Sequence, residues 1–163
     1  MAIAIRNVTP ADLHTVLAMN EGSVPHVNSI SIDQMQDFCD HAAYFRVAVA
    51  DDVLAGFLVG LTPDADYSSP NFRWFCRNYP TFAYIDRVAV AENVRRGGLG
   101  SALYDDFEEF FGSRVPMLAC EVNLRPANPA SMNFHLRRGF TQVGSQELEA
   151  GKKEVAMLVK ALG

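Results

Sequence analysis

Residues 88–101 read VAVAENVRRGGLGS, in which an apolar run leads into two arginines and three glycines. The run has the composition of a strand end, and apolar residues recur at helical spacing from Leu99 onward. Glycines lack a Cβ, so backbone N–H groups there can approach an anion, and a helix N-terminus adds donors without a partner inside the helix. The junction therefore predicts a phosphate-binding turn, with simple strand-to-helix geometry as the structural alternative.

Two common phosphate-binding motifs do not fit this turn. Gly98 and Gly100 are not followed by the third glycine of a dinucleotide-binding fingerprint. No Gly-Lys-Ser or Gly-Lys-Thr sequence follows either, which excludes the loop of nucleotide-hydrolysing proteins. The predicted ligand is therefore a phosphate compound of another kind.

Helix and strand signals flank this turn on both sides. The capping and spacing signals predict helices at 9–20, 98–114 and 128–138, and a further helix that begins at Ser31. Apolar and β-branched runs predict strands at 2–7, 44–50, 53–61, 82–90, 117–122, 141–149 and 154–160. The proline- and aromatic-rich residues 62–80 are expected to form a long connection, either a wall of the acceptor site or a hydrophobic cluster over the sheet.

The order of these elements, β-α-α-β-β-β-α-β-α-β-β, combines adjacent antiparallel strands with helical crossovers. It predicts an α/β (α+β) fold with a mixed, mainly antiparallel central sheet of about seven strands flanked by four helices. The chain has 163 residues, 49% of them hydrophobic, which is an ordinary composition for one globular domain. A single domain over residues 1–163 is therefore expected.

Composition excludes several classes of function. A net charge of −5, from 14 basic and 19 acidic residues, argues against nucleic-acid binding. Three cysteines without CxxC spacing argue against a disulfide framework and against a metal site. No apolar stretch approaches the roughly 20 residues of a membrane span, and the N-terminus does not resemble a secretory signal. The expected location is the cytoplasm.

Two sequence blocks resemble the GNAT acyltransferase superfamily. Arg95, Gly98 and Gly100 match its coenzyme A loop, whose pattern is Gln or Arg, two free positions, Gly, one free position, and Gly or Ala. Residues 128–140, NPASMNFHLRRGF, resemble its late helix. The resemblance implies the acyl-CoA N-acyltransferase fold and transfer of an acetyl group from acetyl-CoA to a primary amine. The acceptor is expected to be a small molecule or a peptide N-terminus, and a homodimer is possible because relatives commonly dimerise.

The resemblance also implies which residues hold acetyl-CoA. The pyrophosphate is expected on the backbone of the glycine-rich turn, that is, on Arg95, Arg96, Gly97, Gly98, Leu99, Gly100 and Ser101. The pantetheine arm is expected along Val88, Ala89 and Val90, where it would pair with main-chain groups as an added strand does. Asn128 and Phe134 are expected to contact the cofactor from the late helix.

An amine acceptor needs a base, because an ammonium group with a pKa of about 10.4 is less than about 0.1% neutral at pH 7. Glu121 resembles the residue that carries the base in some ribosomal-protein N-acetyltransferases, and Asp86 lies where other members place an acidic base. The alternative for either is a structural carboxylate; Asp86, for example, can pair with Arg87 or Arg114. Both residues remain candidates at this point.

His135 occupies the position where family members usually present a tyrosine that protonates the departing thiolate. Its alternative role is that of a packing residue that only hydrogen-bonds the cofactor, and Tyr84 is a second candidate for the phenol. The histidine also keeps open a different class of function, a catalytically silent acyl-CoA binding or sensing module. Residues 24–28, between the first two helices, are a further expected contact of the acceptor.

Overall fold

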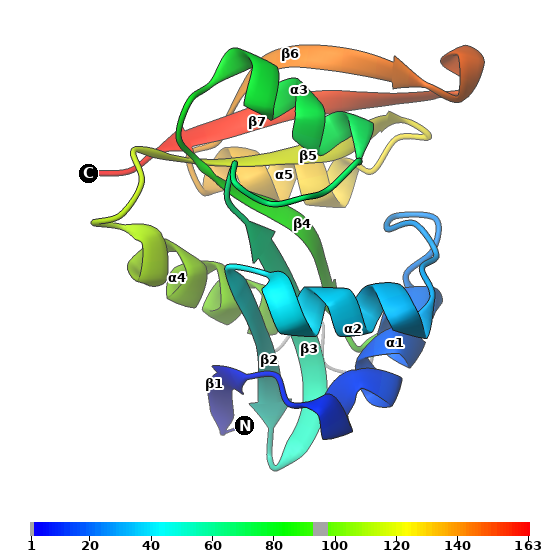
Figure 1. Ribbon diagram of the computed structural model, residues 1–163, viewed down its shortest axis with the longest axis vertical. Coiled ribbons are helices and arrows are strands. Elements are labelled where there is room, and N and C mark those ends of the chain that lie inside the picture. Colours follow the sequence, from blue (N-terminus) through cyan, green and yellow to red (C-terminus); the bar gives the residue numbers. More distant parts are fainter. Residues whose placement is uncertain (1, 93–97) are drawn as a thin grey trace. The chain divides into compact units, whose positions relative to one another are not determined.

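The computed structural model in Figure 1 describes residues 2–92 and 98–163. Its strands form a seven-stranded mixed sheet in the order β1-β2-β3-β4-β5-β7-β6. Internal contacts divide the chain into two compact units: unit 1 comprises Met1–Leu61 and Ile85–Phe111, and unit 2 comprises Thr62–Tyr84 and Gly112–Gly163. The mixed, mainly antiparallel sheet expected from the sequence is confirmed, and a single domain over residues 1–163 stays a prediction.

Unit 1 contains the first three strands, the later part of β4 and three α-helices. The bounds are β1 (Ile3–Asn7), η1 (Pro10–Asp12), α1 (Leu13–Gly22), α2 (Ile32–His41), β2 (Tyr44–Ala50), β3 (Val53–Leu61), β4 (Ala83–Val90) and α4 (Leu99–Phe111). β2 pairs antiparallel with both β1 and β3. The strands predicted at 44–50 and 53–61 form a hairpin through Asp51 and Asp52, whose φ angles of 49° and 67° lie in the left-handed region that aspartate tolerates.

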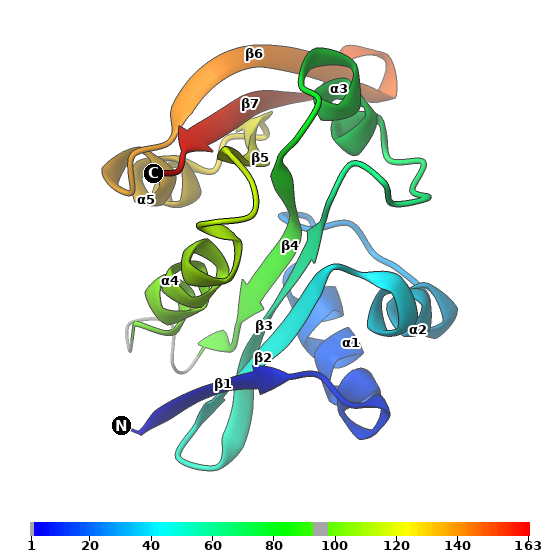
Figure 2. The ribbon, with the colours of Figure 1, turned by 60° about the vertical axis from the view of Figure 1, so that its left-hand side comes forward.

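Helices cover both faces of β2 and β3 in unit 1. Figure 2 shows α4 on one face and α1 with α2 on the other. The apolar side of α4 places Phe107 against β3, where a Cβ at Gly60 would overlap the Phe107 ring. The Tyr44 ring of β2 meets Phe107 edge-on at a centroid distance of 4.9 Å. The helical spacing of aromatic residues in α4 therefore forms the core of this unit.

Unit 2 contains the remaining strands and two α-helices. The bounds are α3 (Pro70–Asn78), β5 (Met117–Arg125), α5 (Pro129–Arg137), β6 (Thr141–Leu148), η3 (Glu149–Gly151) and β7 (Lys153–Ala161), together with the start of β4. β7 pairs antiparallel with both β5 and β6. Ala83 and Tyr84 of β4 pair in parallel with Leu118 and Ala119 of β5. This short parallel pairing fixes the register between Tyr84 and β5.

The helix α3 was not predicted. Prolines at 63, 70 and 80 suggested an irregular connection, yet Pro70 stands in the first turn of the helix, where a missing N–H costs nothing. Phe72 and Phe75 are buried, and their rings lie 5.4 and 5.8 Å from that of Tyr84. The described residues thus form five α-helices rather than the four expected. Residues 62–80 therefore contribute a hydrophobic cluster, and their role as a wall of the acceptor site stays a prediction.

The remaining elements differ from the prediction mainly at their ends. β5 continues to Arg125 instead of ending at residue 122, and the first helix begins with a 3-10 turn. Ser31 caps α2 by accepting a hydrogen bond from the backbone of Gln34, as the capping-box pattern indicated. Over the described ranges 2–92 and 98–163, no helix is both long and apolar enough to cross a bilayer.

Candidate active site

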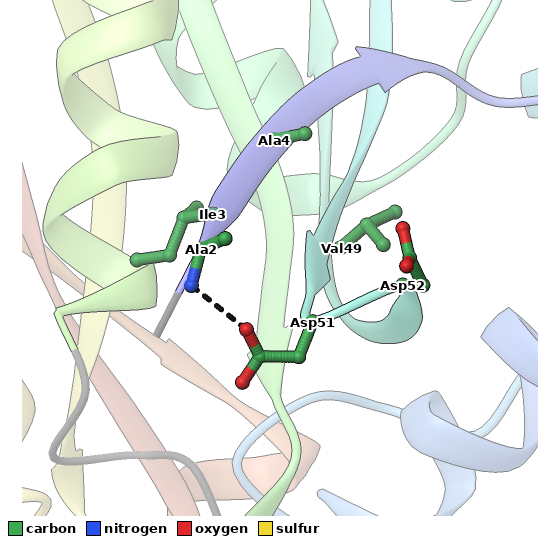
Figure 3. Close-up of a pocket in the computed structure, with 6 residues that line it drawn as sticks. All are labelled: Ala2, Ile3, Ala4, Val49, Asp51 and Asp52. Carbon is green, nitrogen blue, oxygen red and sulfur yellow. Dashed lines mark hydrogen bonds between the residues drawn. The ribbon is translucent and has the colours of Figure 1, made fainter.

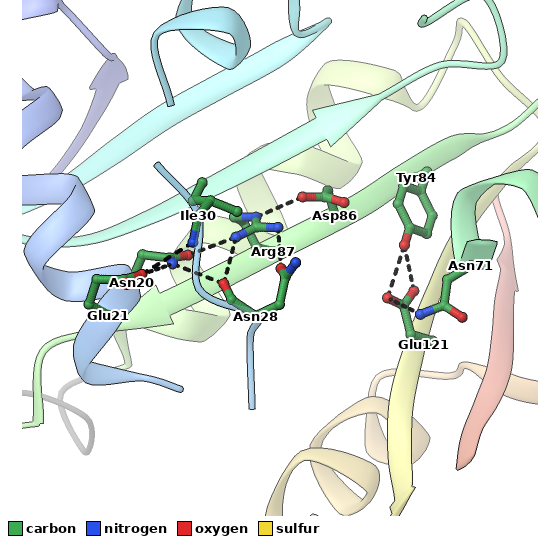
Figure 4. Close-up of polar contacts among 9 residues, drawn as sticks. All are labelled: Asn20, Glu21, Asn28, Ile30, Asn71, Tyr84, Asp86, Arg87 and Glu121. Carbon is green, nitrogen blue, oxygen red and sulfur yellow. Dashed lines mark hydrogen bonds and ion pairs between the residues drawn. The ribbon is translucent and has the colours of Figure 1, made fainter. Parts of the chain in front are cut away.

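Four polar side chains of unit 2 form one hydrogen-bonded network around Glu121. The Tyr84 hydroxyl lies 2.9 Å from Oε1 and 2.7 Å from Oε2 of Glu121, as Figure 4 shows. Asn71 Nδ2 donates to Glu121 Oε1 at 3.2 Å. Gln146 Nε2 donates to Asn71 Oδ1 at 2.9 Å. The network therefore joins α3, β4, β5 and β6 at one carboxylate.

Packing explains why these side chains converge. Tyr84 is fully buried against the aromatic residues of α3, so its hydroxyl has little freedom. Trp74 of α3 lies so close to β6 that a Cβ at Gly144 would come within 2.7 Å of its ring. The absence of a side chain at Gly144 thus lets α3 approach β6 and brings Asn71 within reach of Gln146.

The chemistry of this carboxylate follows from its donors. A phenol and an amide are both neutral, so they orient Glu121 without neutralising its charge. A carboxylate has about four lone-pair positions, and donors of this kind leave its basic form in place. Glu121, which is partly buried, thus has the character required of a general base.

Asp86 has a different environment. Its side chain is 4% exposed and lies 2.7 Å from Nε of Arg87, whose side chain is 2% exposed. Of the two pairings considered from the sequence, the one with Arg87 is present (Figure 4). The guanidinium of Arg87 contacts Oδ2 of Asp86 directly, so this carboxylate serves as the partner of a buried cation. This geometry agrees with the structural alternative for Asp86.

Arg87 also anchors the segment between α1 and α2. Its guanidinium donates to Asn20 Oδ1 at 3.0 Å, to the Asn28 carbonyl at 3.2 Å and to Asn28 Oδ1 at 2.7 Å (Figure 4). Ser29 and Asn20 also donate hydrogen bonds to the Glu21 carboxylate, which hold the same segment to α1 and lower the pKa of Glu21. Part of the segment expected to contact the acceptor, residues 24–28, is therefore fixed to β4 within unit 1.

His135 is 5% exposed on α5, and its ring packs edge-on against Phe134 and Phe140. Its Nδ1 lies 2.7 Å from the Ser131 carbonyl, which can only accept, so Nδ1 carries the hydrogen in this contact. Burial lowers the pKa of His135 and nearby Arg138 adds to this, while the contact with Ser131 opposes it. A neutral ring of this tautomer offers Nε2 as an acceptor, which favours packing over proton donation.

The predicted phosphate turn is described only in its second half. Arg95, Arg96 and Gly97 lie outside the described residues. Gly98 has φ +81° and precedes the 13-residue helix α4, and an added Cβ at either Gly98 or Gly100 would meet none of the described residues within 4 Å. Open backbone at a helix N-terminus, next to Leu99 and Ser101, fits the pyrophosphate of coenzyme A.

The other predicted cofactor contacts lie in both units. In unit 1, Ala89 is buried, and Val88 and Val90 are partly buried along β4. In unit 2, Asn128 caps α5 by accepting from the Ser131 N–H at 3.3 Å. The ring of Phe134 lies 5.7 Å from the Arg138 guanidinium. Within the described parts of the chain, no cluster of three or more His, Cys, Asp or Glu side chains suits a metal ion.

A separate pocket lies at the end of the β1–β2 pair in unit 1 (Figure 3). It is lined by Ala2, Ile3, Ala4, Val49, Asp51 and Asp52. Asp51 accepts a hydrogen bond from the Ala2 N–H at 2.9 Å, and neither aspartate attracts a phosphate. The charge of this lining therefore does not suit coenzyme A.

Asn71 and Gln146 were missed by the sequence analysis. Asn71 belongs to the helix that was not predicted, so its direction had no basis in the expected structure. Gln146 lies in a polar, largely exposed edge strand, where a glutamine gives no signal. Pro70, a helix-start residue directly before Asn71, was the one available indication.

Comparisons with known proteins agree with this arrangement. The profile described as the acetyltransferase (GNAT) family matches residues 14–140. Ard1 from Thermoplasma volcanium has a similar structure, with TM-score 0.81, 22% identity, and 100% of this chain and 99% of that chain covered. Arabidopsis thaliana NAA60, solved with a bisubstrate analogue, gives TM-score 0.78, 16% identity, and 99% coverage of both chains.

The ribosomal-protein-S18-alanine N-acetyltransferase from Escherichia coli gives TM-score 0.75 at 15% identity, covering 99% of this chain and 95% of that chain. A comparison with curated proteins found no significant match. At these identities the solved structures establish the fold, whereas the family profile covers most of the sequence. The chain therefore belongs to the acetyltransferase (GNAT) family and is an N-acetyltransferase that uses acetyl-CoA.

Proposed function

We propose that this enzyme acetylates a primary amine, on a small molecule or a peptide N-terminus, by direct attack in a ternary complex with Glu121 as the general base. The observation that carries the proposal is the Glu121 carboxylate held by the neutral donors Tyr84 and Asn71. The similar Escherichia coli enzyme is named for the alanine of a ribosomal protein, which supports a peptide amine as one acceptor class.

Acetyl-CoA, when bound, supplies an acetyl group activated as a thioester. The amine must lose a proton before its nitrogen can attack, and Glu121 accepts that proton at a carboxylate oxygen. Tyr84 and Asn71 keep the carboxylate in one orientation while its charge changes. As the new C–N bond forms and the C–S bond breaks, the nitrogen loses a second proton. The departing thiolate would take up that proton to give free coenzyme A, whose thiol has a pKa near the 8.5 of cysteine.

The binding residues proposed for acetyl-CoA are those of the glycine-rich turn and β4. The N-terminal backbone of α4, from Gly98 to Ser101, would hold the pyrophosphate, together with Arg95, Arg96 and Gly97. Residues 88–90 would pair with the pantetheine arm, and Asn128 and Phe134 would contact the cofactor from α5. Asp86 and His135 stay predictions as catalytic groups, and their contacts favour anchoring and packing.

The test combines cofactor binding with turnover. Purified protein is titrated with acetyl-CoA by calorimetry, and thiol release is then followed against a panel of small amines and peptides with free N-termini. We expect acetyl-CoA binding, with release that depends on one amine class. Glu121→Gln should bind acetyl-CoA normally and lose about 10²- to 10⁴-fold in turnover.

Glu109→Gln is the matched control, because Glu109 is exposed on α4 and lies outside the network. It removes the same charge and should leave turnover unchanged. If Glu121→Gln turns over as fast as the control variant, the base assignment is wrong and the enzyme acts by positioning alone. Binding without release from any amine would contradict a primary amine as the acceptor.

A further inference from the structure

The amide of Asn71 has two chemically different ends that face different partners. Its NH2 group points at the Glu121 carboxylate, 3.2 Å from Oε1, and its carbonyl oxygen accepts from Gln146 at 2.9 Å. If the amide were reversed, its oxygen would face the carboxylate, and two acceptors would meet without a hydrogen. Only one orientation of Asn71 therefore suits both neighbours.

Gln146 favours that orientation from the other side. Its NH2 group donates to the Asn71 carbonyl oxygen, and the Asn71 NH2 group in turn donates to Glu121. Both hydrogen bonds therefore point the same way, from Gln146 through Asn71 to Glu121. Hydrogen bonds arranged in sequence polarise and strengthen one another, most where water is excluded. Asn71 is 9% exposed, and Trp74 one helical turn later holds α3 against Gly144 of β6.

We propose that Asn71 and Gln146 are positioning residues for the base, with Gln146 fixing the amide of Asn71 so that its NH2 group faces Glu121. This role rests on the proposed function of Glu121. Asn71 acts through the carboxylate that it contacts, and Gln146 acts through Asn71. They act by holding the carboxylate and by stabilising its charged form, which is the form that accepts a proton from the amine.

A measurable consequence follows from this arrangement. A hydrogen bond to a carboxylate stabilises the charged form, so loss of the donor makes the group protonate at higher pH. Asn71→Leu removes the donor directly. Gln146→Met keeps a side chain of similar length but frees the Asn71 amide to reverse, which weakens the donor without adding or removing charge.

The experiment follows the Glu121 side-chain carboxyl by ¹³C NMR during a pH titration of the whole protein, with Glu121→Gln identifying the signal. We expect Asn71→Leu to move the midpoint to higher pH by about one unit. Gln146→Met should move it in the same direction by less. The double variant should match Asn71→Leu alone, because Gln146 acts through Asn71.

Gln142→Met is the matched control. Gln142 lies on the same strand, is exposed, and donates to the Gly144 carbonyl at 3.2 Å instead of to Asn71. It should leave the Glu121 titration unchanged. A midpoint unchanged by Gln146→Met, or further raised by it in the Asn71→Leu background, would overturn the proposal.

The titration needs neither cofactor nor acceptor, so its outcome is separate from that of the amine panel. Failure of every amine would contradict the proposed function and leave the titration result standing. Where an acceptor is found, both variants should lower kcat, shift the acid limb of the pH–rate profile upward and leave the KM for acetyl-CoA unchanged. A change confined to KM would contradict a positioning role.

Discussion

Asp86 and Glu121 are both carboxylates on neighbouring strands of the sheet, yet their surroundings give them different chemistry. Asp86 is buried against the guanidinium of Arg87 at 2.7 Å. Glu121 is partly buried and accepts hydrogen bonds from a phenol and an amide. Asp86 thus pairs with a cation, whereas the neutral side chains of Tyr84 and Asn71 orient Glu121.

The comparison also separates stability from catalysis. Breaking a buried ion pair from one side leaves an unpaired charge, which is costly in the folded state. A neutral side chain in place of Glu121 can still hydrogen-bond to the Tyr84 phenol and the Asn71 amide. We therefore expect substitutions around Asp86 to act on folding and those around Glu121 to act on turnover.

The largest expected effect distinguishes the two carboxylates in turnover. Glu121→Gln should lower kcat by about 10²- to 10⁴-fold, because the acceptor ammonium then has no base nearby. Asp86→Asn should lower it far less in protein that remains folded, since its carboxylate already serves Arg87. Thiol release with the best amine of the panel measures both. Loss of turnover in Asp86→Asn alone would reverse the assignment.

The next largest effect concerns the buried pair of Asp86 with Arg87 and is measured as a change in the free energy of unfolding. Arg87→Met leaves the Asp86 carboxylate buried without its cation and removes the contacts to Asn20 and Asn28, so the free energy of unfolding should fall by about 3–5 kcal/mol. Urea unfolding followed by circular dichroism measures this change. Arg125→Met is the control, because Arg125 is about half exposed in its ion pairs with Glu147 and Glu154.

The control should cost less than about 1 kcal/mol, as exposed ion pairs usually do. Equal losses in the two variants would show that burial adds nothing to the Asp86–Arg87 pair. Partial recovery of stability in Asp86→Asn/Arg87→Met would support the view that the stranded carboxylate is the source of the loss.

The sequence predicted the surroundings of Asp86 better than those of Glu121. The Asp86–Arg87 pair joins adjacent residues, and Glu121 lies in a motif with a family resemblance, so local sequence identified all three residues. Asn71, which contacts Glu121, and Gln146, which contacts Asn71, are separated from Glu121 by 50 and 25 positions. Their approach depends on packing of Trp74 against Gly144, which has no local signature.

The fold was more predictable than the site for the same reason. Strand and helix periodicity is a local property, and the hairpin at Asp51 and Asp52 and the cap at Ser31 were recognisable from a few residues. The helix α3 was missed because its prolines and aromatic residues suggest a loop until the partners that bury Phe72 and Phe75 are known. Tertiary packing decided that segment, and with it the position of Asn71.

A smaller effect tests whether packing beneath Asn71 matters for Glu121. Gly144→Ala places a Cβ within 2.7 Å of the Trp74 ring, so α3 must shift, and the loss of stability should be about 1–3 kcal/mol. Turnover should fall as well, because Asn71 moves with α3. In Gly60→Ala the added Cβ collides with Phe107 within unit 1. This variant should lower the free energy of unfolding and leave the midpoint of the Glu121 titration almost unchanged.

Gly22→Ala is the neutral reference for this pair, since an added Cβ at Gly22 meets nothing within 4 Å. It should leave both stability and the Glu121 titration close to those of the parent. Equal shifts of the Glu121 midpoint in Gly144→Ala and Gly60→Ala would mean that general destabilisation, and not the position of α3, governs the carboxylate.

The smallest expected effect concerns His135, a third titratable group. This side chain is buried between the rings of Phe134 and Phe140, unlike Asp86 or Glu121. Burial lowers the pKa of this histidine below its ordinary value of 6.5, so the folded protein binds the proton less readily than the unfolded chain. Its contribution to stability is therefore intact above pH 6.5 and is lost as the pH falls from there toward the lowered value.

His135→Gln should remove that part of the pH dependence while keeping a side chain able to donate to the Ser131 carbonyl. Urea unfolding at pH 7.5 and pH 5.5 should show a larger acid loss in the parent than in the variant. An identical acid loss in both would indicate that His135 is readily protonated in the folded state, and would restore it as a candidate proton donor.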